Sequence, residues 1–326
     1  MTDLYIIDTD ISLGTPFAEI DDGAALICLR RSLGERVLAV TTVHGNVDVQ
    51  SASWNAQRLC AYLDWDVPVY SGADRPLLED PSWFAGWQAG YGPTPPWPEP
   101  AGDRPAAEII VDLVRAYPGR ITLVALGPLT NLAAALSAAP DIAGLVREVV
   151  CMGGSGAADD PAPEFNFRSD PEAAHIALLA GWPLRLFGLE ITRQVFFSRV
   201  EFEALPAGQP AVDLLKQQAP GWIDRVEAEG WESGGCSLHD AAPVAALIDP
   251  SLFAFEEANV SVELAAGGSR GRTHLLPGKG VRAAAAIREA ACRELVYGLL
   301  KGDHQVCVCE PPNPLHDRET SCPGIP

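Results

Sequence analysis

LYIIDTDISLGTPFAEIDDGAALICLRRSL (residues 4–33) is the stretch that decides the fold. Its first five residues form an apolar run that ends in an acid, as is typical of a short buried strand. The segment 21–33 has the apolar spacing of a helix and opens on two acids. A strand that leads through an acid-bearing loop into a helix predicts the start of a βαβ unit.

The rest of the chain repeats this alternation of strands and helices. Further strands are expected at 36–43, 67–72, 120–126, 147–154 and 183–191. Helices are expected at 51–63, 105–117, 129–139 and 171–181, followed by a hairpin at 260–275 and a helix at 283–300. The pattern predicts an α/β fold with a mostly parallel central sheet and helices on both faces, in one domain over residues 1–301. Residues 302–326 have no periodicity and are expected to form an irregular C-terminal tail.

The composition excludes several classes of protein. Of the 326 residues, 48% are hydrophobic, which is enough to form a core and excludes general disorder. The chain has no run of about 18 apolar residues and no signal-peptide pattern, so we expect a cytoplasmic protein without a membrane partner. The net charge of −20 disfavours a nucleic-acid polymer as partner.

The cysteines fit the same compartment. Cys28, Cys60, Cys151 and Cys292 lie in apolar runs, where a thiol usually acts as a small core side chain. We therefore expect reduced thiols. The CVC sequence at 307–309 lacks a second ligand pair with zinc spacing, which makes a zinc site there a weak hypothesis.

Two acids directly follow the first strand and two open the first helix: Asp8, Asp10, Asp21 and Asp22. Ligands of such sheets bind beyond the carboxyl ends of the strands, where these side chains would converge. Carboxylates held together repel one another unless a hard cation such as Ca²⁺ binds between them. The alternative is that Asp21 and Asp22 only cap the helix and complement its dipole.

Two later clusters carry candidate polar ligands. His239 and Asp240 open another apolar helical stretch, an arrangement that is usually structural. Glu164 and Asn166 flank Phe165 in PEFNFRSDPEAA, which we interpret as an extended segment with both polar side chains on one side. A carboxylate beside a carboxamide suits the vicinal hydroxyls of a sugar, although a loop stabilised by an Asx turn explains the pair equally well.

The segments together resemble the inosine–uridine-preferring nucleoside hydrolases, over residues 4 to about 300. The resemblance rests on seven segments in family order: DTD with the later DD, TTVHGNV, DVPVYSGADRPL, ITLVALGPLTNLAAAL, VVCMGG, PEFNFRSDPEAA and LHDAAPVAALIDPSLF. It implies hydrolysis of the N-glycosidic bond of a small-molecule nucleoside, with a tightly bound Ca²⁺. It also implies a homodimer or homotetramer.

Site residues follow from the resemblance position by position. The implied Ca²⁺ ligands are Asp10, Asp22, Asp240 and the backbone carbonyl of Leu126, with Asp8 orienting the metal-binding carboxylates. The implied ribose-binding residues are Asp21, Asn46, Glu164 and Asn166. Asp10 would also deprotonate the attacking water, and His239 would protonate the leaving base.

Two aromatic segments, 80–104 and 221–236, are candidate flaps over a planar base. Their side chains expected to contact the base include Trp87, Tyr91 and Trp231, with Trp83, Trp97 and Trp222 also available for stacking. The alternative is a rigid surface lid that is packed by its own aromatic residues.

The chain departs from the family pattern at three places. The family opening DxDPGxDD places the paired acids four residues after the second Asp, whereas here Asp21 comes eleven residues after Asp10. The family often has a histidine in the loop that here reads GWQAGYGP, but this chain has no histidine between His44 and His175. Ala158, Asp159 and Asp160 occupy the region where the family often has an Asn.

Two rival readings remain. A non-catalytic protein that binds a ribosylated ligand on this fold stays open, and a haloacid-dehalogenase-like phosphatase is a remote alternative. Such phosphatases need a lysine beside their acids. None of the three lysines of this chain lies in an acid-bearing loop at a strand end, so the phosphatase reading lacks support.

Overall fold

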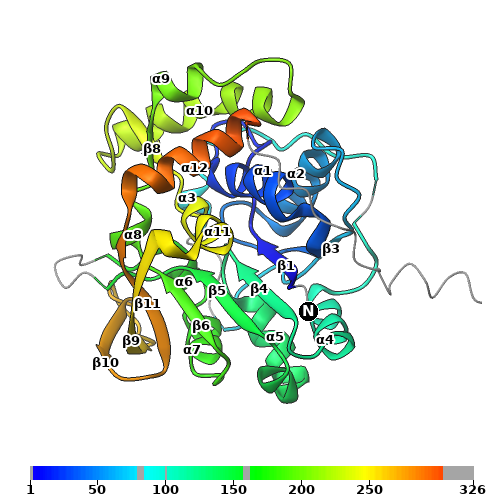
Figure 1. Ribbon diagram of the computed structural model, residues 1–326, viewed down its shortest axis with the longest axis vertical. Helices are drawn as coiled ribbons and strands as arrows, with labels where there is room; N and C mark the ends of the chain where they lie inside the picture. The colour runs from blue at the N-terminus through cyan, green and yellow to red at the C-terminus, as the bar shows by residue number, and fades with distance from the viewer. Residues whose placement is uncertain (1–2, 79–83, 100, 157–161, 304–326) are drawn as a thin grey trace, which may run out of the picture.

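A computed structural model describes residues 3–78, 84–99, 101–156 and 162–303. Its centre is a nine-stranded sheet in the order β10-β9-β11-β6-β5-β4-β1-β2-β3 (Figure 1). The bounds are β1 Leu4–Thr9, β2 Val37–Thr42, β3 Val69–Ser71, β4 Ile121–Ala125, β5 Glu148–Met152, β6 Leu184–Phe187, β9 Phe253–Val262, β10 Thr273–Pro277 and β11 Val281–Ile287. Neighbouring strands from β11 to β3 run parallel, which confirms the expected α/β class.

Helices cover both faces of the sheet. One face packs against α1 (Asp21–Leu33), α2 (Val49–Tyr62), α10 (Pro210–Ala228), α11 (Ala241–Ile248) and α12 (Glu289–Lys301). The other packs against α4 (Ala106–Ala116), α5 (Thr130–Ala138) and α7 (Pro171–Leu178). In Figure 1 the first set lies above the strands and α4 and α5 lie below them.

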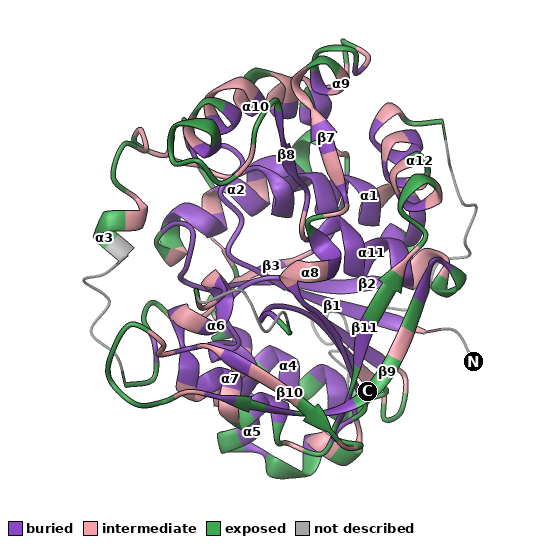
Figure 2. Cartoon of the chain, turned by 90° about the vertical axis from the view of Figure 1, so that its left-hand side faces the viewer, coloured by how far each residue is buried: buried purple, intermediate pink, exposed green. Residues whose placement is uncertain are grey.

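The strand β1 explains why the sheet sits between two cores. Successive side chains of a strand point to opposite faces, so a strand covered on both sides must be apolar throughout. Tyr5 and Ile7 belong to the core that contains α1, whereas Leu4 and Ile6 belong to the core that contains α4. The central strands are therefore buried along their length (Figure 2).

The C-terminal part of the sheet corrects one prediction. Residues 283–287, expected to begin a helix, form the end of β11, and the helix α12 starts only at Glu289. Alanines favour helix in isolation, but Ala283 pairs with both β6 and β9, and tertiary pairing outweighs a propensity of a few tenths of a kcal/mol per residue. The expected hairpin is present, between β9 and β10.

The segment 221–236 also differs from its prediction as a flap. Residues up to Ala228 continue the long helix α10, and residues 235–237 form β8 (Gly235–Ser237), which pairs with β7 (Phe196–Ser198) in a separate two-stranded sheet. The short helices α8 (Leu189–Thr192) and α9 (Arg199–Glu203) precede α10. Pro220 lies inside α10 and did not end it.

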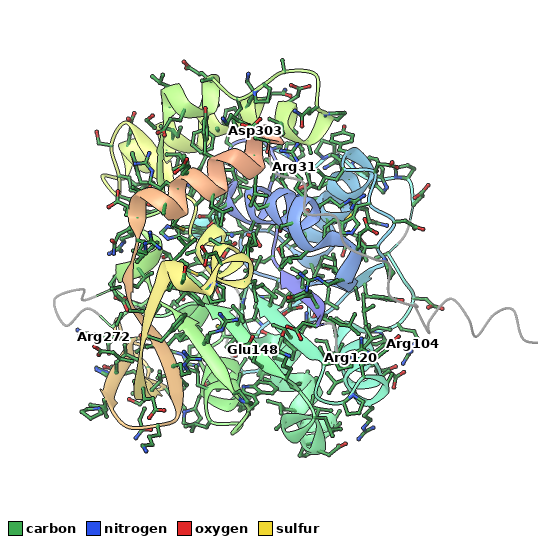
Figure 3. The ribbon with its side chains drawn as sticks, viewed as in Figure 1. Arg31, Arg104, Arg120, Glu148, Arg272 and Asp303 are labelled. Atoms are coloured by element: carbon green, nitrogen blue, oxygen red, sulfur yellow. The ribbon has the colours of Figure 1, made fainter. Side chains whose placement is uncertain are left out.

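Residue contacts fix the last helix on the first. Arg31, in the last turn of α1, donates to the carbonyl oxygen of Leu300 in α12 at 2.6 Å, and Figure 3 shows it beside that helix.

The five cysteines in the described part are buried and free of disulfides, as expected for four of them. Among the described residues, none of the helices is long and apolar enough to span a bilayer. Residues 304–326 of the predicted tail lie outside the described part of the chain.

Candidate active site

A cavity of about 390 Å³ opens at the carboxyl ends of the parallel strands. Its acidic lining residues are Glu19, Asp21, Asp22, Glu164, Glu232 and Asp240. Its aromatic lining residues are Trp87, Phe165, Trp222 and Trp231, and Asn46, Leu126, Asn166 and His239 complete the set relevant here. The fold therefore brings together segments that are more than 200 residues apart in the sequence.

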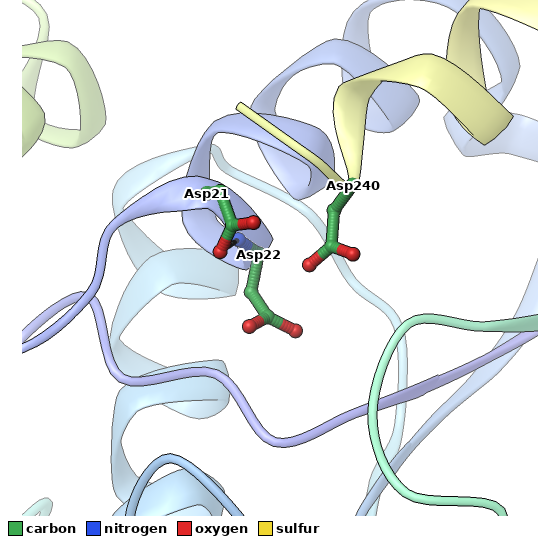
Figure 4. A group of neighbouring side chains, drawn as sticks. All are labelled: Asp21, Asp22 and Asp240. Carbon is green, nitrogen blue, oxygen red and sulfur yellow. Dashed lines mark hydrogen bonds between the residues drawn. The ribbon is translucent and has the colours of Figure 1, made fainter. Parts of the chain in front are cut away.

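Three carboxylates converge in this cavity. Asp21 and Asp22 open α1 and Asp240 precedes α11, and one oxygen from each lies within 4.8 Å of the others (Figure 4). Each of the three residues is buried. The side chain of Asp240 makes no capping hydrogen bond to its helix, so capping does not account for its position.

Burial and mutual repulsion destabilise these three carboxylates when they are ionised without a bound cation. The pKa of Asp240 is raised well above its usual range, first by burial and then by the charges of Asp21 and Asp22. Burial also raises the pKa of Asp22 to about 6. A divalent cation would relieve both effects, since it replaces the lost water and neutralises the repulsion.

Asp10 lies beside this group and is fully buried. Its Oδ2 accepts a hydrogen bond from the backbone N–H of Asn46 at 2.7 Å, while its Oδ1 has no hydrogen-bond partner within the described residues. Glycines admit the carboxylate: a Cβ at Gly45 would lie 2.1 Å from Oδ2, and one at Gly127 would lie 2.7 Å from Oδ1. An unpartnered buried oxygen beside Asp22 fits a cation ligand or a proton acceptor.

Asp8 is buried and bonds to residues of β2 and α5. Its Oδ1 accepts hydrogen bonds from Thr41 Oγ1 at 2.6 Å and Asn131 Nδ2 at 2.7 Å. Burial raises its pKa to about 7. These bonds join β1 to β2 and α5, and they do not involve the carboxylates that Asp8 was expected to orient; that orienting role stays a prediction.

The helix α6 (Phe165–Ser169) positions the second polar pair, which corrects the expectation of an extended segment. Glu164 caps this helix and accepts from the backbone N–H of Gly154, Asn166 and Phe167 at 2.7 to 3.0 Å. Asn166 donates from Nδ2 to the carbonyl oxygen of Leu126 at 2.7 Å. Because a carbonyl oxygen has two lone pairs, Leu126 can still accept from a second partner or bind a cation.

Asn46 connects the acids to the aromatic wall. Trp87, at the end of α3 (Phe84–Trp87), donates from its indole N–H to Asn46 Oδ1 at 3.1 Å. The amide of Asn46 also lies close to the carboxylates of Asp22 and Glu19. Asn46 thus lies between the aromatic residue Trp87 and the carboxylates of Asp22 and Glu19.

The aromatic residues form one packed cluster. Trp87 stacks on Trp231 with ring centroids 5.3 Å apart and planes at 10°, and its centroid lies 4.4 Å from that of Phe165. A separation of 5.3 Å leaves no room for a base between Trp87 and Trp231, so a base would stack on an outer face or displace Trp231, which is 48% exposed. Tyr91 does not line the cavity; its ring lies under the guanidinium of Arg225, 4.7 Å away. Trp83 lies outside the described residues.

His239 lines the cavity next to Asp240. Its Nδ1 lies 2.9 Å from Thr192 Oγ1 in α8. Burial, followed by the charge of Arg193, lowers the pKa of His239 to about 4. The ring is therefore neutral at pH 7. If the Thr192 hydroxyl donates to Nδ1, the single ring proton is on Nε2.

Glu19 is a cavity residue that the sequence analysis missed. It lies in the enlarged segment between Asp10 and Asp21, whose role was left open. An acid two residues before the Asp21–Asp22 pair, in an otherwise uncharged stretch, was the available signal. Ala158, Asp159 and Asp160, at the third departure from the family pattern, lie outside the described residues.

Comparisons with known proteins identify relatives of this chain. The model of the inosine-uridine preferring nucleoside hydrolase family matches residues 5–308. The chain is 31% identical over 264 residues to the pyrimidine-specific ribonucleoside hydrolase RihB of Escherichia coli O1:K1, which covers 78% of this chain and 83% of that protein. The plant nucleoside hydrolase PpNRh1 superposes with a TM-score of 0.78 at 28% identity, over 92% of this chain and 99% of the plant chain. A purine-preferring ribonucleoside hydrolase from Gardnerella vaginalis gives a TM-score of 0.77 at 27% identity, over 92% and 99% of the two chains.

The parallel sheet, the acid-lined cavity at its strand ends and these matches define an N-glycosidase of the nucleoside hydrolase class. Within that class, the chain belongs to the inosine-uridine preferring nucleoside hydrolase family.

Proposed function

We propose that this protein hydrolyses the N-glycosidic bond of ribonucleosides, or of a related N-riboside, to ribose and free base in a Ca²⁺-dependent reaction. The observation that carries the proposal is the convergence of Asp21, Asp22 and Asp240 in a cavity that also holds a carboxylate–carboxamide pair and an aromatic wall. The named relatives differ in the bases they prefer, pyrimidine in one case and purine in another, so the proposal does not specify the base.

The cation would be held by Asp10, Asp22, Asp240 and the carbonyl oxygen of Leu126. The donor set supports this, since all of these ligands are hard oxygens and Asp10 Oδ1 lacks another partner in the described structure. When bound, Ca²⁺ would lower the pKa of a water molecule and hold it in place.

Asp10 would take the proton from the attacking water. Its free oxygen and its fixed orientation, set by the Asn46 N–H, suit a base that must act at one position. Negative charge around the sugar would stabilise the ribosyl cation that develops as the bond to the base breaks.

Asp21, Asn46, Glu164 and Asn166 would hold the ribose hydroxyls. Glu164 is fixed by three backbone N–H donors, so its carboxylate is pre-oriented at no cost when substrate binds. The aromatic wall, with Trp87 and Trp231, would stack on the base and exclude water.

The departing base needs a proton or a hydrogen bond. We assign this role to His239, which Thr192 holds at the cavity wall. Since the imidazole is neutral, it would act by donating a hydrogen bond from Nε2 to the departing base, which takes its proton from water. As a further part of the proposal, the protein is a cytoplasmic homodimer or homotetramer.

A panel of purine and pyrimidine ribonucleosides tests the proposed function. Free base should appear with purified protein, should disappear after chelation of divalent cations and should return on addition of Ca²⁺. Release of base that is unaffected by exhaustive chelation would contradict the calcium dependence, and a panel without any cleaved member would contradict the substrate class.

A further inference from the structure

The segment 11–20, enlarged relative to the family opening, packs into the core and is held by hydrogen bonds. Ile11, Leu13 and Ile20 are fully buried. Ser12 Oγ donates to the backbone carbonyl of Glu19 at 2.8 Å, which closes the segment on itself. A loop with three buried apolar anchors holds its polar side chains in fixed positions.

Hydrogen bonds tie this segment to two neighbouring elements. The backbone N–H of Gly14 donates to Gln218 Oε1 of α10 at 2.8 Å. Asn55 of α2 donates to the carbonyl oxygen of Ile11 at 3.2 Å and to Thr15 Oγ1 at 3.0 Å. The segment is therefore held from the side of both helices.

The same segment also supports the loop that carries Trp87. The N–H of Gly92 donates to the carbonyl oxygen of Pro16 at 2.9 Å, and Thr15 Oγ1 lies 2.7 Å from Thr94 Oγ1. The enlarged segment thus lies between the acidic group and the aromatic loop.

Glu19 is the residue that this arrangement brings into the cavity. Its side chain lines the cavity together with Asn46, and Asp21 and Asp22 lie close enough for their charges to act on it. It is not one of the three carboxylates that converge within 4.8 Å.

The chemistry of a carboxylate limits what Glu19 can recognise. In its ionised form, which a cation bound at the neighbouring acids would favour, the carboxylate only accepts hydrogen bonds, and its two oxygens offer about four acceptor positions. The Asn46 amide beside Glu19 cannot fill four positions, so the others require donors from water or from a ligand. Sugar hydroxyls are the neutral donors that the proposed substrate presents beside Asn46.

We propose that Glu19 is a substrate-binding residue that accepts a hydrogen bond from the 2′,3′-diol of the ribose, next to Asn46. The inference rests on the proposed function and adds to it a specificity residue supplied by the enlarged segment. Loss of a hydrogen bond to a charged acceptor should lower discrimination in favour of the diol by about tenfold.

Steady-state kinetics of Glu19→Ala and Glu19→Gln test the proposal, with a ribonucleoside and its 2′-deoxy and 3′-deoxy analogues as substrates. Glu19→Ala should reduce kcat/KM for the ribonucleoside about tenfold more than for at least one deoxy analogue. Glu19→Gln should show a smaller change, because glutamine keeps one acceptor oxygen. Glu99→Gln, an exposed change of the same charge on the aromatic loop, should keep the parental ratios.

Two further measurements separate other roles of Glu19. Calorimetric titration with D-ribose and 2-deoxy-D-ribose should show the same loss of discrimination, and it works even if the parent protein cleaves no nucleoside. Ca²⁺ affinity should fall by less than tenfold, and the melting temperature of the Ca²⁺-loaded variants should stay close to the parental value. Unchanged discrimination in both assays, or a tenfold loss of Ca²⁺ affinity in Glu19→Gln, would overturn the proposal. A parent that binds ribose but cleaves no nucleoside would overturn the proposed function alone.

Discussion

At the scale of single residues, the candidate active site is characterised by its buried carboxylates. A buried charge persists in a fold only where hydrogen bonds or an opposite charge compensate for lost water. Glu164 has three backbone donors, whereas Asp10 has one oxygen without a partner in the described structure. The two residues therefore have different parts in the proposal: Glu164 holds the sugar and Asp10 accepts a proton.

Asp10→Asn tests the proton acceptor. The asparagine amide has the same shape and can keep the bond from the Asn46 N–H, but it cannot accept the proton of a water molecule. We expect a fold with unchanged circular dichroism and a kcat reduced by about 10³-fold or more. A variant that cleaves its best nucleoside at the parental rate would exclude Asp10 as the base.

His239→Ala tests the leaving-group role. We expect natural nucleosides to be cleaved about 10²-fold more slowly. The p-nitrophenyl riboside should be barely affected, because p-nitrophenolate leaves without a proton. If His239 only orients Asp240, both substrates should lose rate to the same extent, since they share the same acidic group.

At the scale of elements, the short helix α6 links the sugar-binding pair to the strands. Its cap, Glu164, uses both carboxylate oxygens on backbone N–H groups, which fixes the start of the helix against the Gly154 loop. Asn166, the second residue of the same helix, bonds to the loop after β4. A helix of five residues is stable here because its ends are held by tertiary bonds.

The pH dependence of stability tests the burial of Glu164. Burial raises its pKa to about 7 from an ordinary value near 4.5. The folded state then binds a proton more tightly than the unfolded state, so the stabilisation is complete below pH 4.5 and is lost as the pH rises to about 7. The unfolding free energy of the metal-free protein should fall by up to about 3 kcal/mol over this range from this group.

Chemical denaturation at several pH values measures the slope. Glu164→Gln should lower stability at every pH, because the amide cannot accept from all three N–H groups, and it should remove this part of the slope. Glu99→Gln at the surface should keep the parental slope. A Glu164→Gln protein with the full parental slope would contradict the assignment.

At the scale of the whole molecule, the acidic group links distant parts of the chain. Asp21 and Asp22 come from α1 and Asp240 from α11, two helices that pack on the same face of the sheet. Their repulsion opposes the packing of these helices, whereas a cation between them would reinforce it.

Thermal unfolding tests this balance. Saturating Ca²⁺ should raise the melting temperature of the metal-free protein by several degrees, because a cation at 100 times its Kd adds about 2.7 kcal/mol of stability. In the double variant Asp22→Asn, Asp240→Asn, the metal-free protein should melt above the metal-free parent, since two repelling charges are gone. Its response to Ca²⁺ should be lost, and a retained response would place the cation elsewhere.

The sequence by itself determined the class of fold and the chemical nature of the site. Short apolar runs that alternate with helical patterns indicate the central strands of a mostly parallel sheet. An acid placed directly after such a strand lies at the strand end, as Asp10 does, whereas Asp22 opens the first helix. These inferences hold because they depend on local order along the chain.

Tertiary structure alone decided the rest. Ala283 to Ile287 form a strand because β6 and β9 flank them, which no local propensity reveals. Glu19 enters the cavity because buried side chains and contacts with α2, α10 and the aromatic loop position its segment. Trp87 packs against Phe165 and Trp231, although these residues are far apart in the sequence. Such placements depend on contacts between distant segments, whose free energy exceeds local preferences and is not encoded in any one stretch of the chain.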